Sequence, residues 1–349
     1  MLRKRMSVFL AMVLVIGLLA GCAPKAPAPA PQGEQPAPEE QPLKIAMVTD
    51  VGGVNDRSFN QSAWEGLQKA KNDLGIEANY QESKQEADYE TNIETLVDQG
   101  NDLVWGIGFL MANTIEEAAK NYPDQKFAII DNAYEDTPDN LVGVVFKEQE
   151  PSFLVGYIAG KMTKTNKVGY IGGMDFAVIH KFEYGFKAGV KYANPDVEVL
   201  SQYAGAFDKP AIGRSIAESM YQQGADIIFH AAGDTGNGMI EVAREQNKFA
   251  IGVDKDQNPD APDHVITSAM KRVDSAMYHI AEDLKAGKFP GGTTVTYGLA
   301  EGGVDIAPTS DKHVPKEILT EVDALKQRII SGEIVVPQNK EEFEAFEVQ

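Results

Sequence analysis

The feature that most constrains the fold is an alternation of short apolar runs with longer amphipathic segments, which occurs twice along the chain. In the first half it predicts strands at 43–49, 102–107 and 127–131, and a helix at 59–74 that is closed by Gly75. In the second half it predicts strands at 168–171, 197–203, 226–229 and 249–253, and helices at 182–192 and 212–223. Such alternation predicts an α/β fold in which helices cover both faces of parallel sheets.

Short segments of the two halves also match each other. Residues 99–102 (QGND) precede one predicted strand, and residues 223–226 (QGAD) precede another. Residues 126–131 (KFAIID) match residues 248–254 (KFAIGVD) with one insertion. Because the spacing between these landmarks is nearly constant, the repeat predicts two homologous lobes rather than chance similarity.

The N-terminus predicts export and lipidation. A basic start at 3–5 and an apolar run at 8–20 form a secretory signal, and the run is shorter than the about 20 residues that span a membrane. The end of the run, LAGC at 19–22, resembles the bacterial lipobox, so we expect removal of residues 1–21 and acylation of Cys22, the only cysteine. The alternative is an ordinary signal with a chance cysteine. Residues 22–42, rich in Pro and Ala, predict a linker.

Charge and histidine spacing exclude some classes of function. The formal net charge of -20 repels nucleic acid and anionic lipid, so we expect no nucleic-acid partner, and solubility explains most of this charge. The five histidines show no metal-ligand spacing, and none lies in an HExxH pattern. The sequence therefore predicts neither a metal site nor a cofactor.

Acidic side chains follow the predicted strands where ligands of open α/β sheets bind. Asp50 ends the first strand, and Asp131 and Asp254 end equivalent strands of the two repeats. The equivalence places Asp131 and Asp254 on opposite sides of a cleft. For Asp56 and Ser58, in the polar loop after Asp50, we favour an Asx turn or a helix cap.

Two aromatic residues lie in otherwise polar loops of the two halves. Phe59 follows the first strand, and Phe207 lies in the sequence GAFD at 205–208. A ring at such a position either packs under its loop or contacts a ligand. One ring from each lobe could hold a flat ligand between them.

The chain resembles a known family from residue 43 to its C-terminus. The motifs that carry the resemblance are Thr49-Asp50, Gly52-Gly53, Asp56, Ser58-Phe59-Asn60-Gln61, Trp64-Glu65-Gly66, Ala231-Ala232-Gly233, Gly252-Val253-Asp254 and Ser268-Ala269-Met270-Lys271. They are similar to those of the basic membrane protein (BMP) lipoproteins, which are substrate-binding components of ABC importers and include receptors for purine nucleosides. The resemblance implies a type I periplasmic-binding-protein fold, with two doubly wound, Rossmann-like lobes and three hinge crossings. The implied N-terminal lobe is 43–148 plus about 273–300, and the C-terminal lobe is about 149–272 plus about 301–349.

The resemblance also implies a site. Phe59 and Phe207 would stack on the two faces of a nucleoside base. We assign Asp50 and Asn60 to the base edge, and we expect the ribose hydroxyls to bind Asp131, Gly233, Asp254 and Lys271. Several carboxylates and one lysine favour a nucleoside over a nucleotide.

The implied role is a non-enzymatic receptor. It would act as a monomer, lipid-anchored at the extracytoplasmic face of the cell membrane, and deliver purine nucleosides such as guanosine, inosine or adenosine to an ABC permease and its ATPase. The sequence leaves three alternatives open: a receptor of the same fold for a sugar or another heterocycle, a sensory lipoprotein, and a nucleoside-processing enzyme.

Overall fold

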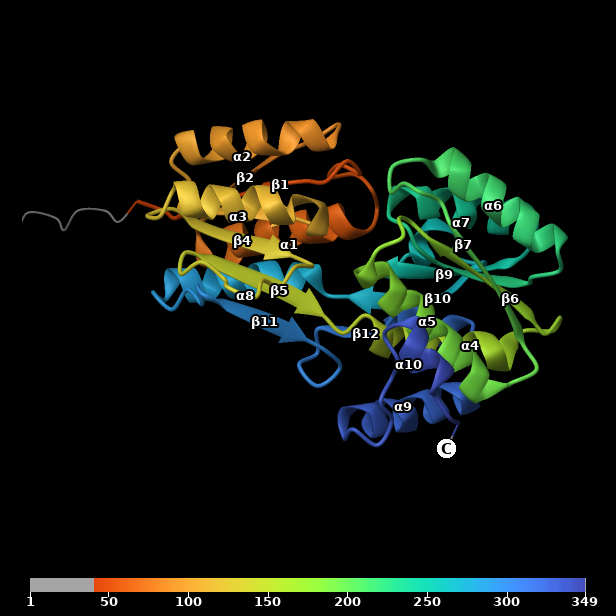
Figure 1. Cartoon of the computed structure of the whole chain (residues 1–349). Coiled ribbons are helices and arrows are strands. Elements are labelled where there is room, and N and C mark those ends of the chain that lie inside the picture. The colour runs from red at the N-terminus through yellow and green to blue at the C-terminus, as the bar shows by residue number, and fades with distance from the viewer. Residues whose placement is uncertain (1–40, 349) are drawn as a thin grey trace, which may run out of the picture. The chain divides into compact units, whose positions relative to one another are not determined.

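The strands form two separate six-stranded sheets (Figure 1). The computed structural model describes residues 41–348. The first sheet has the order β11-β5-β4-β3-β1-β2, and all of its strands are parallel. Its strands are β1 (Lys44–Val48), β2 (Glu77–Gln81), β3 (Leu103–Ile107), β4 (Lys126–Ile130), β5 (Leu141–Phe146) and β11 (Thr293–Tyr297).

The second sheet repeats this order with one change of direction. Its order is β12-β10-β9-β8-β6-β7, and only the pairing of β10 with β12 is antiparallel. Its strands are β6 (Lys167–Gly172), β7 (Glu198–Tyr203), β8 (Ile227–Ala231), β9 (Phe249–Asp254), β10 (Val265–Lys271) and β12 (Val304–Ile306). Strand by strand, β4 of the first sheet therefore corresponds to β9 of the second.

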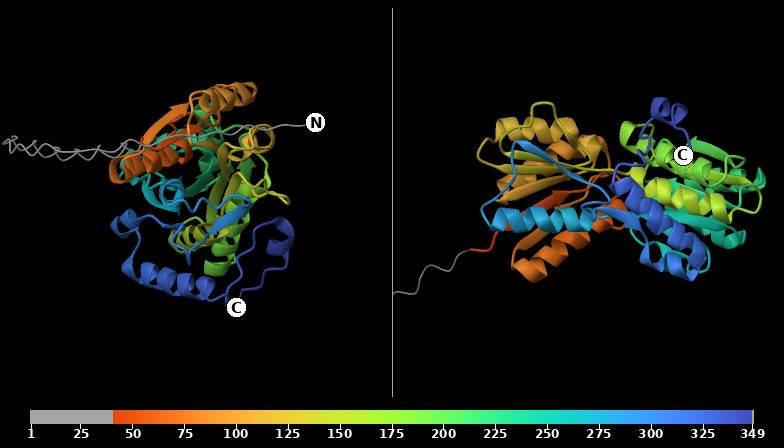
Figure 2. Two further views of the ribbon diagram at one scale, coloured as in Figure 1. Left: turned by 90° about the vertical axis from the view of Figure 1, so that its left-hand side faces the viewer. Right: turned by 90° about the horizontal axis from the view of Figure 1, so that it is seen from below.

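Helices cover both faces of each sheet. Around the first sheet, α2 packs with α3 on one face and α1 packs with α8 on the other, as Figure 1 and the views in Figure 2 show. Around the second sheet, α6 packs with α7, and α4 packs with α5 and α9. The α-helices are α1 (Phe59–Leu74), α2 (Tyr89–Asp98), α3 (Ala112–Asn121), α4 (Gln149–Met162), α5 (Ala177–Ala193), α6 (Pro210–Gln222), α7 (Asp234–Glu245), α8 (Val273–Lys285), α9 (Lys316–Ile330) and α10 (Lys340–Glu344). Short 3-10 helices are η1 (Glu86–Asp88), η2 (Phe109–Met111), η3 (Asn258–Asp260) and η4 (Pro308–Lys312).

The chain passes between the two sheets three times. It leaves the first sheet after β5, returns after β10 and leaves again between β11 and β12. This confirms the predicted α/β fold of two lobes with parallel sheets. The residue boundaries given above for the lobes stay a prediction. The expected signal peptide, the lipidated Cys22 and nearly all of the linker lie outside the described residues.

Local sequence explains why the predicted elements form. Strand β3 (LVWGI) is buried at all five positions, as expected for a central parallel strand covered on both faces. Helix α1 ends at Gly75, whose left-handed φ of 70° lets its N–H bond the Lys71 carbonyl at 3.2 Å. Each strand and helix named in the sequence analysis is confirmed within a few residues. Within residues 41–348, no helix is long and apolar enough to span a membrane.

Helices α4 and α5 approach each other through glycines. A Cβ atom at Gly156 would lie 2.2 Å from the Phe186 carbonyl oxygen, and one at Gly189 would lie 2.0 Å from that of Phe153. Larger residues would push the helices apart, so the glycines permit direct backbone contact. This packing buries most of α4, including its first turn, next to the point where the chain first crosses between the sheets.

Candidate functional site

The loop after β1 folds around the carboxylate of Asp56. Its Oδ1 accepts hydrogen bonds from the backbone N–H groups of Ser58 at 2.9 Å and Gln61 at 3.1 Å, and its Oδ2 accepts from the N–H of Asn60 at 2.9 Å. These are donors that the start of α1 would otherwise leave unpaired. The turn and cap role that the sequence predicts for Asp56 is therefore confirmed.

The expected cap role of Ser58 is wrong. Its side chain makes no capping hydrogen bond, because the Asp56 carboxylate already occupies the end of the helix. Instead, Ser58 Oγ donates to Asp254 Oδ2 at 2.5 Å, and Asp254 belongs to the other lobe. Ser58 is thus a contact between the lobes.

Asp50 and Asn60 form a second buried pair in the same loop. The Asp50 Oδ1 atom accepts from Asn60 Nδ2 at 2.7 Å and from the Gly52 N–H at 2.8 Å. Burial, assisted by the charge of Asp56, raises the pKa of Asp50 to about 7 against the pull of these two donors. Asp50 can therefore gain or lose a proton near neutral pH.

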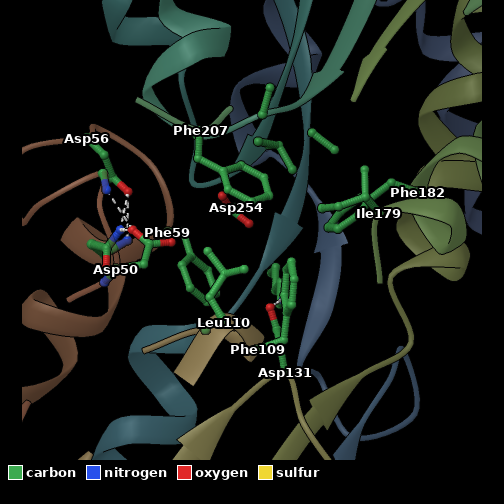
Figure 3. A pocket seen from close by; sticks show the side chains of 18 residues that line it. Asp50, Asp56, Phe59, Phe109, Leu110, Asp131, Ile179, Phe182, Phe207 and Asp254 are labelled. Carbon is green, nitrogen blue, oxygen red and sulfur yellow. Dashed lines mark hydrogen bonds and ion pairs between the residues drawn. The ribbon is translucent and has the colours of Figure 1, made fainter. Parts of the chain in front are cut away.

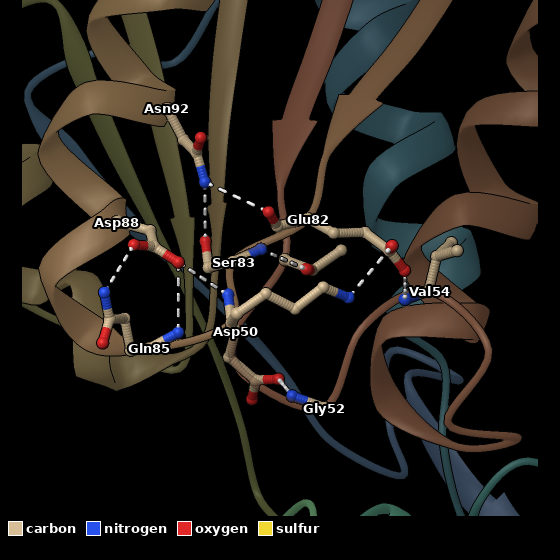
Figure 4. Close-up of polar contacts among 10 residues, drawn as sticks. Asp50, Gly52, Val54, Glu82, Ser83, Gln85, Asp88 and Asn92 are labelled. Carbon is tan, nitrogen blue, oxygen red and sulfur yellow. Dashed lines mark hydrogen bonds and ion pairs between the residues drawn. The ribbon is translucent and has the colours of Figure 1, made fainter.

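A neighbouring segment supports this loop from behind (Figure 4). Glu82 Oε1 accepts from the Val54 N–H at 3.0 Å, and Asn92 Nδ2 donates to Ser83 Oγ at 3.0 Å. These contacts tie the loop to the end of β2 and to α2. Glu82 could not be identified from the sequence, because a single glutamate after an edge strand carries no recognisable pattern.

Asp131 and Asp254 occupy equivalent places in the two lobes. Asp131 directly follows β4 and Asp254 ends β9, and their φ angles of 70° and 63° both lie in the left-handed region. Few residues other than glycine adopt this region, so the shared conformation supports the repeat inferred from the sequence. Burial raises the pKa of Asp254 to about 7, while Lys271 and the Ser58 hydroxyl oppose this shift.

Lys271 is a fully buried cation among carboxylates and rings. Its Nζ lies 2.6 Å from Asp131 and 3.1 Å from Glu148, and 5.1 Å from the centre of the Phe59 ring. Burial alone would lower the pKa of Lys271, but Asp131, Glu148 and Asp254 outweigh it and raise the pKa. The ammonium is therefore charged, and it balances part of the acidic charge around it.

The two predicted rings each rest on a glycine of their own lobe. A Cβ atom at Gly108 would lie 3.4 Å from the Phe59 ring, and one at Gly173 would lie 2.2 Å from the Phe207 ring. A third ring, Phe109 of η2, lies 6.2 Å from Phe207 between centroids. Phe109 was not among the residues predicted from the sequence, although it follows the end of a strand, as Phe59 does. Figure 3 shows the three rings close together at the cavity.

All eight predicted ligand-binding residues line one cavity between the lobes (Figure 3). They are Asp50, Phe59, Asn60, Asp131, Phe207, Gly233, Asp254 and Lys271. Other residues that line the cavity were not predicted as ligand-binding residues, among them Asp56, Phe109, Leu110, Ile179 and Phe182. Among the described residues, no group of three or more His, Cys, Asp or Glu side chains could hold a metal ion.

Side chains of the second lobe also hold the loop of the first. Asn237 Nδ2 donates to the Asp56 carbonyl at 2.9 Å, and Gln257 Nε2 donates to the Arg57 carbonyl at 3.3 Å. A hydrogen bond with His230 orients the side chain of Gln257: the Oε1 atom of Gln257 lies 2.9 Å from the Nε2 atom of His230. Burial lowers the pKa of His230 to about 4, so the ring is neutral. Its Nε2 carries the proton and donates this bond, because an amide oxygen can only accept. The sequence offered no signal for these long-range contacts.

The cavity between the lobes has a volume of about 50 Å³. A water molecule takes up about 30 Å³ and ligand pockets usually measure about 300–1,000 Å³. A ligand of ordinary metabolite size therefore needs a larger space, which movement of the lobes or the rings would provide.

The raised pKa values predict that closure of the lobes depends on pH. Opening the cleft hydrates Asp50 and Asp254, so their pKa values fall from about 7 toward the ordinary 3.8. Closure of the lobes therefore takes up protons. The contribution of these two acids to the stability of the closed form is fully present below pH 3.8 and is lost as the pH rises through about 7. Without added ligand, small-angle X-ray scattering should give a smaller radius of gyration at about pH 5 than at about pH 8.

The control for this experiment is the variant D50N/D254N, which lacks both titrating groups. Its radius of gyration should change less with pH than that of the parent protein. An equal change in both proteins would contradict the assignment of the effect to these two acids.

Comparison with known proteins identifies the family. Residues 43–340 match the family described as Bmp, ABC transporter substrate-binding protein PnrA-like. The chain is 43% identical to the "CD4+ T-cell-stimulating antigen" of Listeria innocua, over 97% of this chain and 99% of that protein. It is 40% identical to the "ABC transporter nucleoside-binding protein BmpA" of Lactococcus lactis subsp. cremoris, over 84% of this chain and 89% of that protein.

A solved structure shows the same fold. A solute-binding protein of an ABC transporter system from Aeropyrum pernix K1 superimposes with a TM-score of 0.80 at 33% identity, over 87% of this chain and 96% of that chain. The two-lobe fold, the cavity between the lobes and the sequence similarity all point to the same family. The chain belongs to the Bmp family of PnrA-like ABC transporter substrate-binding proteins.

Proposed function

We propose that the protein binds nucleosides, and purine nucleosides such as guanosine, inosine and adenosine in particular, for uptake by an ABC importer. The observation that carries this proposal is the gathering of the eight predicted residues around one cavity, with rings on both lobes. The Lactococcus relative, whose name states nucleoside binding, supports the same class of ligand.

The division of the cavity suits the two halves of a nucleoside. Phe59 and Phe207 supply apolar ring faces for the base, and Asp50 with Asn60 supplies acceptors and a donor for its edge. Asp131, Asp254 and Lys271 supply charged groups for the ribose hydroxyls, and Gly233 permits close approach of the backbone. Under this assignment no side chain acts as a nucleophile, which favours binding over catalysis.

The charge of the cavity favours a neutral ligand. Its lining contains four carboxyl groups, at Asp50, Asp56, Asp131 and Asp254, against the single ammonium of Lys271. Lys271 is already in contact with Asp131. A phosphate group would meet excess negative charge and no free cation, so nucleotides should bind far more weakly than nucleosides.

We further propose that the receptor acts as a monomer at the extracytoplasmic face of the cell membrane, held there by an acylated Cys22. The residues that would carry the anchor lie outside the described part, so their sequence pattern alone supports this. The linker would let the lobes reach the permease while the lipid keeps them nearby.

A thermal-shift screen tests the proposed ligand class. Purified protein from residue 43 onward should melt at a higher temperature with guanosine, inosine or adenosine, because a ligand present at 100 times its Kd adds about 2.7 kcal/mol to stability. Guanosine monophosphate should give a much smaller shift. A shift with a sugar or riboflavin, and none with any nucleoside, would contradict the proposal; release of free base, seen by chromatography, would indicate an enzyme instead.

A further inference from the structure

Glu148 is a buried carboxylate that touches the site without lining the cavity. Its side chain is 1% exposed, and it lies between β5 and α4, where the chain first crosses between the lobes. Glu148 Oε1 lies 3.1 Å from Lys271 Nζ, and Glu148 Oε2 lies 3.1 Å from Lys181 Nζ. One carboxylate thus bridges two ammonium groups.

These contacts form a chain of alternating charges through the region where the lobes join. The order is Asp131, Lys271, Glu148 and Lys181. Lys271 ends β10, directly before the second crossing, and Lys181 also donates to the carbonyl of Phe146 at the end of β5 at 3.1 Å. The chain of charges therefore links two of the crossing segments to the cavity.

Local structure does not account for the Glu148 side chain. It stands at the position preceding α4 but makes no side-chain capping bond to the helix. Its burial carries a desolvation penalty that the two ammonium groups offset. Because Lys271 Nζ lies between Glu148 and Asp131, removing the Glu148 charge leaves the ammonium free to shift toward the remaining cavity acids.

We propose that Glu148 is a positioning residue for ligand binding: by holding the Lys271 ammonium from the side of the hinge, it keeps Lys271 and Asp131 in the arrangement that the ligand meets. The choice of nucleosides as probes rests on the proposed function above. The geometry of the charge chain does not depend on that choice.

The proposal predicts a change in how Asp131 titrates. Burial raises the pKa of Asp131, Lys271 lowers it, and the negative charge of Glu148 raises it again. The other charged groups that face it are Lys181 from α5 and Asp254 from β9. Replacing Glu148 with Gln removes a neighbouring negative charge, so Asp131 should lose its proton at a lower pH.

The binding experiment is calorimetric titration with guanosine or inosine across pH 4.5–8. We expect E148Q to weaken binding by about 10–100-fold, the range found for residues that orient the ligands of a metal. Protonation of Asp131 removes an acceptor for the ribose hydroxyls, so the pH at which this protonation weakens binding should also be lower in E148Q than in the parent protein. E148D, which keeps the charge, should recover much of the affinity and return this pH toward that of the parent protein.

The matched control is E150Q, because Glu150 is also buried at the start of α4 but bonds Lys147 and the Leu299 N–H instead. Its affinity and pH profile should stay close to those of the parent protein. Binding by E148Q that is unchanged, or weaker by the same factor at every pH, would overturn the proposal, because either result reduces Glu148 to a structural role.

A second measurement needs no ligand. In protein labelled with ¹³C at the aspartate carboxyl carbons, with the Asp131 signal assigned from D131N, the midpoint of the Asp131 titration should be lower in E148Q than in E150Q. Equal midpoints would overturn the positioning role even if no nucleoside binds. Failure of the parent protein to bind any nucleoside, with the midpoint shift present, would instead count against the proposed function alone.

Discussion

Replacing Lys271 with Met is expected to lower the free energy of unfolding by about 3–5 kcal/mol, because removing one partner of a buried ion pair strands the other charge. Lys271 is 2% exposed and contacts two carboxylates, Asp131 and Glu148, whose side chains are 7% and 1% exposed. Methionine has a similar length but no charge, so the change isolates electrostatics from packing. Urea denaturation followed by circular dichroism measures the difference.

The matched control is K120M, which removes an exposed lysine from its pair with Glu116. Exposed pairs contribute about 0–1 kcal/mol, so this variant should unfold almost as the parent protein does. Adding E148Q to K271M should recover part of the loss, since one stranded carboxylate is then neutral. Similar stabilities of K271M and K120M would show that Lys271 is not held as a paired buried cation.

Replacing Phe207 with Ala is expected to weaken purine nucleoside binding by about 1–3 kcal/mol, the range for stacking of a base on a protein aromatic side chain. The ring lies on Gly173 and lines the cavity, so its loss removes one apolar face and leaves the polar groups in place. Isothermal titration calorimetry with guanosine or inosine measures the change in affinity.

The control for this prediction is F343A. Phe343 is partly buried on α10, packs near Tyr184 at 5.9 Å between ring centroids, and does not line the cavity. It should lose stability without losing affinity. If F207A binds nucleosides as tightly as the parent protein, Phe207 is a core residue and the stacking assignment is wrong.

Much of the fold could be predicted because its signals are local. A buried parallel strand such as β3 is apolar along its whole length. A helix such as α1 has one apolar and one polar face and ends at a residue such as Gly75. The repeat then fixed the number of lobes. The sequence did not predict the direction of the edge strand in each sheet: β12 is antiparallel to β10, whereas its counterpart β11 is parallel to β5.

The candidate site divides in the same way. Residues at strand ends, such as Asp131 and Asp254, could be predicted because parallel strands bring their ends to one edge of the sheet. Contacts that form only where the two lobes meet could not be predicted. Ser58, for example, bonds a residue 196 positions away, and a serine at the start of a helix suits the role of a helix cap equally well. Glu148 could not be predicted for a similar reason, because its partners Lys181 and Lys271 belong to two other elements, α5 and β10.

The left-handed backbone at Asp131 and Asp254 has a consequence for how the protein can change. Glycine would occupy both positions with less strain, and strained residues of this kind cost about 1–3 kcal/mol each. At Asp131, however, glycine would also leave the buried Lys271 ammonium without its carboxylate partner, which costs about 3–5 kcal/mol and outweighs the relief of strain. Engineering this receptor for heat resistance by conventional relief of backbone strain would thus remove one carboxylate from each side of its cavity and, at Asp131, lower its stability.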